Sequence, residues 1–142
     1  MIELSVTERQ IGVYGGKMGF WIFMMIMELL IPFIMIIFGK SFMKKPPRTI
    51  NYAYGYRTKR SMKNMDTWTF AHKYIGRIWY ISGLALLPIS LVPMIIVLGK
   101  EKDIIGTVGG VITFIQLILL IGAIFPTEYA LSKKFDSEGN AR

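Results

Sequence analysis

Three long apolar stretches, separated by polar segments, dominate the pattern along the chain. The first covers about residues 18–39 and contains one charged residue, Glu28; the second covers about 75–98, with Arg77 near its start; the third covers about 104–125 and has no charge. A helix rises about 1.5 Å per residue, so about 20 apolar residues cross the hydrocarbon core of a bilayer. The pattern therefore predicts an all-α integral membrane protein with three transmembrane helices.

The charged residues predict how these spans are oriented. The segment between the first two spans, residues 40–74, contains nine of the 17 basic residues and a single acid, Asp66. The nine are Lys40, Lys44, Lys45, Arg48, Arg57, Lys59, Arg60, Lys63 and Lys73. Such an excess is typical of cytoplasmic loops. We therefore expect the N-terminus outside and both the basic loop and the tail, residues 126–142, inside.

Composition narrows the classes of function. The chain, residues 1–142, is short enough for a single membrane domain; 53% of it is hydrophobic and its net charge is +8. A chain that is both apolar and basic favours a bilayer with anionic lipid at its cytoplasmic face, and not nucleic acid. It has no cysteine and one histidine, His72, so a Cys- or His-rich metal site is excluded. We expect no cofactor and no enzyme activity, because no nucleophile and base pair is apparent.

Two polar side chains are predicted near the middle of the membrane. Glu28 lies ten residues from the outer start of its span and Gln116 twelve from the outer start of its own. An ionised glutamate at this depth is costly, so Glu28 should be protonated, paired or facing a water-filled cavity. Two interpretations stay open: a proton or ion relay or ligand contact, and a protonated Glu28 hydrogen-bonded to Gln116 to join two helices.

Small residues in the third span predict close helix packing. Gly106 and Gly110 have GxxxG spacing, with Gly109 beside them, and this pattern lets two helix backbones approach each other. Pro126 is expected to end the third helix.

The basic segment is predicted to contain an ordered loop followed by a helix. Pro46-Pro47 cannot be helical, and residues 51–56 are rich in tyrosine around Gly55. Ser61 and Asn64 are good N-cap residues, so a helix should begin between Ser61 and Asp66. Apolar and aromatic residues then recur every three or four positions, which predicts a helix in the membrane interface, with the aromatic side chains as interfacial anchors. These residues are Met65, Trp68, His72, Ile75 and Trp79.

A longer motif runs through this loop and helix start: Asn51-x3-Gly55-Tyr56-Arg57-Thr58-x2-Ser61-Met62-x-Asn64-x3-Trp68-x2-Ala71-His72-x3-Gly76. This string resembles the SdpI immunity family of bacterial membrane proteins. Longer members of that family have an additional membrane region ahead of the module, so the resemblance is to a short form. The resemblance implies a multi-pass protein of the bacterial cytoplasmic membrane that neutralises a secreted toxic peptide. It also implies a cytoplasmic partner, since the best-known member holds a transcriptional repressor at the membrane.

The motif supplies candidate ligand- or partner-binding residues at the cytoplasmic face. The Arg57 guanidinium suits bidentate pairing with a carboxylate or phosphate, and Gly55 would allow the loop backbone close to whatever Arg57 holds. His72, one turn after Trp68, lies on the same helix face. The alternative is structural, with Arg57 and Asn64 tying the loop to helix ends. The full candidate set is Asn51, Gly55, Arg57, Thr58, Ser61, Asn64, Trp68 and His72.

Two functions from different classes remain open at this stage. The first is an immunity or interaction protein that recognises a membrane-active peptide or a cytoplasmic regulator through the Arg57 motif. The second is a small transporter or channel that uses Glu28 and the second span, which Pro88 and Pro93 interrupt. Three spans are too few to enclose a pore, so the second function requires a homo-oligomer.

Overall fold

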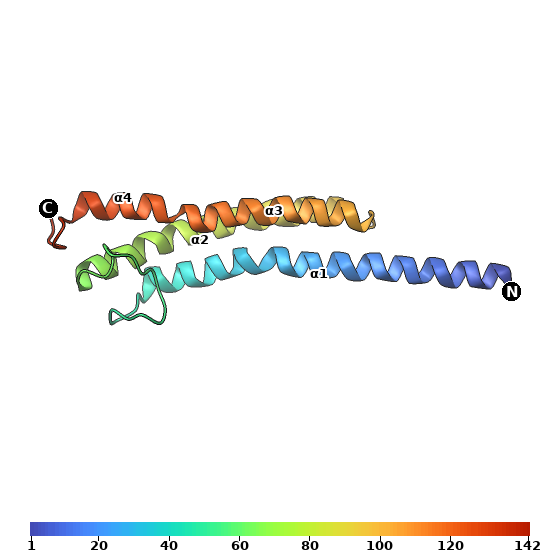
Figure 1. Cartoon of the computed structure of the whole chain (residues 1–142), viewed down its shortest axis with the longest axis horizontal. Coiled ribbons are helices and arrows are strands. Elements are labelled where there is room, and N and C mark those ends of the chain that lie inside the picture. Colours follow the sequence, from blue (N-terminus) through green and yellow to red (C-terminus); the bar gives the residue numbers. More distant parts are fainter.

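The computed structural model describes residues 1–142 and is all-helical (Figure 1). The helices are α1 (Ile2–Lys44), α2 (Met65–Ile96), α3 (Lys102–Gly122) and α4 (Ile124–Lys134). Three helical stretches are long and apolar enough to cross a membrane: α1, α2, and α3 taken together with α4. The prediction of an all-helical chain with three such helices is confirmed.

The first helix is much longer than its apolar stretch. It starts at Ile2 and runs to Lys44, whereas hydropathy predicted a span over about 18–39. Its 43 residues correspond to about 64 Å. No proline precedes Pro32, so nothing forces the helix to end before the apolar stretch, and the hydroxyls of Ser5 and Thr7 donate to carbonyls of the preceding turn. Figure 1 shows this end of α1 projecting well beyond the turn that joins α2 to α3.

Close packing of α1 against α2 depends on glycines. A methyl group added at Gly39 would lie 2.6 Å from the Tyr80 backbone nitrogen, and one at Gly76 would lie 2.8 Å from the Gly39 carbonyl oxygen. Further along, a methyl group at Gly83 would lie 2.9 Å from the Pro32 carbonyl oxygen. The two helices therefore touch backbone to backbone, as small residues permit in membranes.

The third span differs from its prediction in where it packs and how it ends. A Cβ at Gly110 would meet open space, and one at Gly106 would only touch Phe20 at 3.7 Å. The close approach falls instead at Gly109, where a Cβ would collide with the Met24 side chain. The helix also breaks at Ala123 and continues as α4, with Pro126 in the first turn of α4. Proline is tolerated there because its missing N–H would have no helical partner.

The C-terminal residues are folded and were not predicted to be so. The chain turns back after α4, with a bridge between Phe135 and Ala141. The Asp136 carboxylate accepts the backbone N–H groups of Glu138 and Asn140, and these bonds hold its pKa below the usual range. The segment predicted as a tail, 126–142, is therefore a helix followed by a tight turn.

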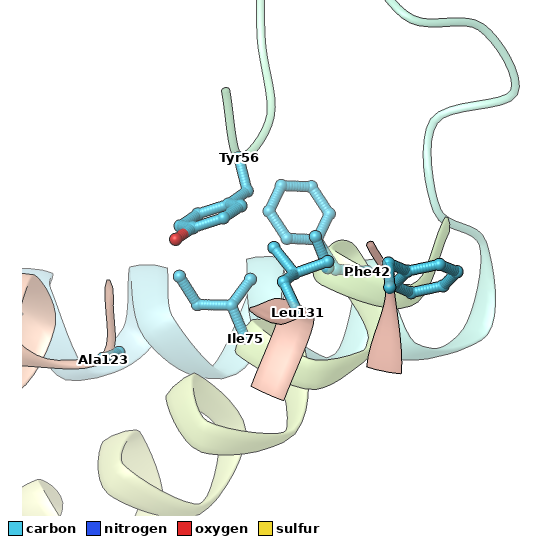
Figure 2. Packing of buried hydrophobic residues seen from close by; sticks show 7 residues of the cluster. Phe42, Tyr56, Ile75, Ala123 and Leu131 are labelled. Atoms are coloured by element: carbon cyan, nitrogen blue, oxygen red, sulfur yellow. The ribbon is translucent and has the colours of Figure 1, made fainter. Parts of the chain in front are cut away.

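One end of the bundle carries α4 and the connection between α1 and α2, and we name this end of the bundle the loop end. A hydrophobic cluster lies there. Figure 2 shows Tyr56 entering this cluster from the connecting loop, together with Ile75 from α2 and Leu131 from α4. The cluster consists of Phe42, Tyr56, Ala71, Ile75, Ala123, Leu131 and Phe135. It joins α1, α2 and α4 to the loop and fixes where the motif residues stand.

Candidate functional site at the loop end

The motif loop, residues 45–64, begins with a turn built by Asn51. Its side-chain Oδ1 accepts the backbone N–H groups of Ala53 and Tyr54, each at 3.0 Å, and its Nδ2 donates to the Thr49 carbonyl at 3.1 Å. Asparagine favours such turns because its short amide competes with backbone groups. Asn51 therefore shapes the loop from within.

Gly55 and His72 join the motif loop to α2. Gly55 has a φ of +111°, and a Cβ there would collide with His72 Nε2. The Tyr56 backbone N–H donates to His72 Nε2 at 2.9 Å, while His72 Nδ1 lies 2.7 Å from the Trp68 carbonyl oxygen. A carbonyl can only accept, so Nδ1 carries the proton and Nε2 is free to accept: the ring is the neutral tautomer. His72 is fully buried, so it supports the loop instead of facing a ligand.

A glutamate of α4 completes the site. The Tyr56 hydroxyl and the Thr58 hydroxyl both donate to Glu128 Oε1, each at 2.7 Å, and Arg60 Nε lies 3.7 Å from Glu128 Oε2. Burial and the neighbouring Glu128 carboxylate raise the pKa of Tyr56 far above its ordinary value, so the phenol keeps its proton and donates it. Glu128 thus ties the motif loop to the third span.

Sequence reasoning missed Glu128 and gave Tyr56 no role. One signal was available: Glu128 is the single acid between Asp103 and Asp136, and it directly follows the third apolar stretch. An acid at that place lies on the same side of the membrane as the basic loop, which makes it a natural partner for that loop.

Ser61 and Asn64 close the loop against the start of α2. The Ser61 hydroxyl donates to the Tyr56 carbonyl at 2.8 Å and accepts the Thr58 N–H at 2.9 Å. Asn64 caps α2 in a capping box with Thr67, and its Nδ2 donates to the Gly139 carbonyl at 2.8 Å. The prediction that the helix begins between Ser61 and Asp66 is confirmed, and the cap also holds the C-terminal turn.

Trp68 is buried in the structure. Its indole N–H donates to the Pro47 carbonyl at 3.0 Å, and its ring packs on His72. The expectation of an interfacial anchor at Trp68 is wrong, because a fully buried ring cannot face lipid. Trp79 is partly buried and donates to the Leu120 carbonyl at 3.1 Å, which joins α2 to α3.

Arg57 is the motif residue that faces outward. Its side chain is exposed and its guanidinium donates to the Tyr52 carbonyl of the same loop, with no carboxylate paired to it. The guanidinium has five N–H groups, so several remain free for a ligand. The structure therefore brings Gly55, Thr58, Ser61, Asn64, Trp68 and His72 together as the support of a loop that presents Arg57.

Glu28 and Gln116 lie far from this site, among the three spans. Gln116 Nε2 donates to the Glu28 backbone carbonyl at 2.7 Å, and the Thr113 hydroxyl donates to Glu28 Oε1 at 2.8 Å. This contact places Glu28 and Gln116 at the same level of the helix bundle. The predicted partner atom differs, since Gln116 bonds to the backbone of Glu28 and Thr113 bonds to its side chain.

Replacing Glu128 by alanine is expected to loosen the motif loop. Tyr56 and Thr58 would lose their shared acceptor, and a partly buried hydroxyl without a partner costs about 1–3 kcal/mol. Limited proteolysis of purified protein should then cut within residues 45–64 several times faster. Glu138→Ala is the matched control, since the Glu138 side chain is exposed and makes no hydrogen bond or ion pair. Equal cleavage of the two variants would contradict the role given to Glu128.

These features define a class of protein: a multi-pass helical membrane protein with a folded loop, bonded to its last helix, at one end of the bundle. Residues 48–127 match the SdpI/YfhL protein family, and the chain belongs to that family. The chain is also 34% identical over 101 residues to YfhL of Bacillus subtilis (strain 168), which carries the name "Uncharacterized protein YfhL". The aligned part covers 71% of this chain and 77% of that relative. No solved structure matches the chain.

Proposed function

We propose that this protein is a membrane immunity protein that protects its bacterial cell from a membrane-active toxic peptide. The observation that carries the proposal is that residues 48–127, which match a family named for toxin immunity, include most of the motif loop, with Arg57, and His72, which supports it. A fixed loop that presents the exposed guanidinium of Arg57, with no carboxylate paired to it, is suited to binding an anionic group.

The ligand of Arg57 in this proposal carries a carboxylate or phosphate. A planar guanidinium pairs with either in a bidentate geometry, whereas the lysines around it act as point charges toward anionic lipid. The anionic group belongs to the toxic peptide or to a cytoplasmic regulatory protein, and the loop end is the surface for both.

The proposed orientation puts the loop end in the cytoplasm and the N-terminus outside the cytoplasmic membrane. The excess of basic residues in 40–74 supports it. Because the chain has no cysteine, single Lys59→Cys and Lys100→Cys variants give a clean test. An impermeant thiol reagent added to intact cells should label position 100 and leave position 59 unlabelled until the cells are opened. The reverse pattern would invert the orientation.

Arg57→Lys is expected to abolish most of the protection while the protein still folds and inserts. Lysine keeps the positive charge but lacks the planar guanidinium that pairs with an anionic group through two parallel hydrogen bonds. Charge-assisted hydrogen bonds contribute about 1.5–3 kcal/mol, or about one to two orders of magnitude in affinity. The measurement is survival of toxin-exposed cells at matched protein levels. Lys59→Gln is the control, because Lys59 is exposed, unpaired and adjacent to the motif residues. Full protection by Arg57→Lys would show that the Arg57 guanidinium is not part of the binding site.

A second candidate function, a small oligomeric transporter or channel, is favoured by one observation. Glu28 is buried among three spans with one carboxylate oxygen lacking a hydrogen-bond partner. This function requires several copies of the chain around a path. A monomer in native mass measurements of the detergent-solubilised protein would argue against it.

A further inference from the structure

The three spans meet at a polar junction, which we define as Glu28, Ser90, Thr113 and Gln116. Thr113 of α3 donates to Glu28 Oε1 of α1 at 2.8 Å, and Gln116 Nε2 donates to the Glu28 carbonyl at 2.7 Å and to Ser90 Oγ of α2 at 2.8 Å. Glu28, Ser90 and Gln116 are essentially fully buried. Each of the three spans thus contributes a polar group to one enclosed point.

Two oxygen atoms of the junction have no donor. They are Glu28 Oε2 and Gln116 Oε1. The orientation of the Gln116 amide is fixed, because the Glu28 carbonyl can only accept and therefore faces Nε2. Both hydrogens of Nε2 are then used, by the Glu28 carbonyl and by Ser90, and Oε1 is left bare. Unpaired buried acceptors are costly, and those of a carboxylate especially so.

No side chain can supply the missing positive charge. Within the apolar stretches 18–39, 75–98 and 104–125, the one Asp, Glu, His, Lys or Arg other than Glu28 is Arg77, which precedes Ser90 by 13 residues on α2, about 20 Å along the helix axis. The other members of the junction, Ser90, Thr113 and Gln116, do not carry charge. Gly109 brings α3 close to this carboxylate, since a Cβ there would lie 3.2 Å from Glu28 Oε1 and would collide with the Met24 side chain, which fills the remaining space. A ligand of the junction must therefore be small, positively charged and able to bind to oxygen atoms.

We propose that the polar junction is a binding site for a monovalent cation, a proton or a sodium ion, held between Glu28 and Gln116. A proton sits on Glu28 Oε2 and makes it a donor. A sodium ion uses the carboxylate and the Gln116 Oε1 as ligands, with the hydroxyl oxygens of Ser90 and Thr113 beside them. Either cation neutralises the Glu28 carboxylate and gives the unpaired oxygen atoms a partner. Transporters bind such ions near the middle of the membrane.

Cation binding at this place would stabilise the contact of all three spans, independently of the function of the loop end. A ligand that binds only the folded protein raises its stability in proportion to the logarithm of its concentration. For a proton taken up on folding, the unfolded state binds fewer protons at neutral pH. The free energy of unfolding is then largest at low pH and decreases as pH rises. The equilibrium constant for unfolding increases by about tenfold per pH unit.

The test is the thermal unfolding midpoint of the purified full chain in detergent, measured between about pH 5 and 8 with sodium chloride or choline chloride. If the bound cation is a proton (the proton arm), the unfolding midpoint of wild type falls as pH rises and does not depend on sodium. If the bound cation is sodium (the sodium arm), the midpoint rises with sodium concentration at the higher pH. Glu28→Gln should lose whichever response is seen, and Glu138→Gln, which alters an exposed acid, should keep it. Identical responses of wild type and Glu28→Gln to both cations would overturn the proposal.

Infrared spectroscopy of the wild type tests the proposal without a variant, in case Glu28→Gln does not fold. In sodium-free buffer at neutral pH, the exposed acids are ionised, so a protonated Glu28 gives an isolated carboxylic acid band. The proton arm predicts that this band persists when sodium is added. The sodium arm predicts that added sodium removes it. Absence of an acid band in sodium-free buffer, with no change on adding sodium, would show a carboxylate that binds neither cation.

Discussion

Replacing Gly76 by valine is expected to prevent α1 and α2 from packing and to give the largest loss of stability of any single change discussed. A Cβ at position 76 would lie 2.8 Å from the Gly39 carbonyl oxygen, 2.9 Å from Phe42 Cβ and 3.1 Å from the Met43 backbone nitrogen. Two of these three atoms belong to the backbone and cannot rotate away. Overpacking a core costs about 1–3 kcal/mol and more when the neighbours cannot yield. We expect a cost of about 3 kcal/mol or more.

Gly110→Val is the matched control for Gly76→Val. It introduces the same side chain into another span, at a helix position with nothing within 4 Å. The measurement is the thermal unfolding midpoint and the monodisperse fraction in detergent. The Gly110 variant should match wild type, and the Gly76 variant should unfold at a clearly lower temperature. Equal midpoints for both variants would show that α1 and α2 do not touch at Gly39 and Gly76.

Gly55→Ala is expected to release the motif loop and abolish protection while the three spans remain folded. Two effects combine. Alanine at a φ of +111° adopts a backbone conformation that L residues avoid, at about 1–3 kcal/mol. Its methyl group would also collide with His72 Nε2, the acceptor of the Tyr56 N–H. The loop must then move away from α2, and the Tyr56 bond to Glu128 is lost with it.

Gly99→Ala separates the two effects. Gly99 also has a positive φ, +77°, but a Cβ there meets nothing within 4 Å. The control should therefore lose stability through its backbone alone and keep protection. Amide hydrogen exchange of residues 51–61 should rise strongly in the Gly55 variant and stay unchanged in the Gly99 variant. Protected amides in the Gly55 variant would contradict the contact between the loop and His72.

The sequence was informative where a local pattern determines structure. Long apolar runs predicted the three spans, and the N-cap residues Ser61 and Asn64, with Asp66 after them, predicted where α2 begins. Equal depth in two spans also predicted that Glu28 and Gln116 approach each other. Each of these depends on spacing along one helix or on the thickness of the bilayer, and both can be computed from a single chain.

The rest depended on contacts between distant parts of the chain. Tyr56 and Glu128 are separated by 72 residues, and no periodic pattern connects them. Hydropathy marks the part of a helix that lies in hydrocarbon and not its ends, so it missed the first residues of α1 and most of α4. The contact of Gly55 with His72, 17 residues later, was missed for the same reason. The missing side chain of Gly55 makes room for the His72 imidazole.

Protection of living cells tests the central claim most directly. A sensitive bacterial host would express the wild-type chain, the Arg57→Lys variant or no protein, at matched membrane levels, and would be challenged with the peptides secreted by the strain that encodes the chain. Our account predicts that wild type raises the peptide concentration needed for killing by about tenfold or more, and that Arg57→Lys returns it close to the value without protein. Identical killing of cells with and without the wild-type protein would contradict the account.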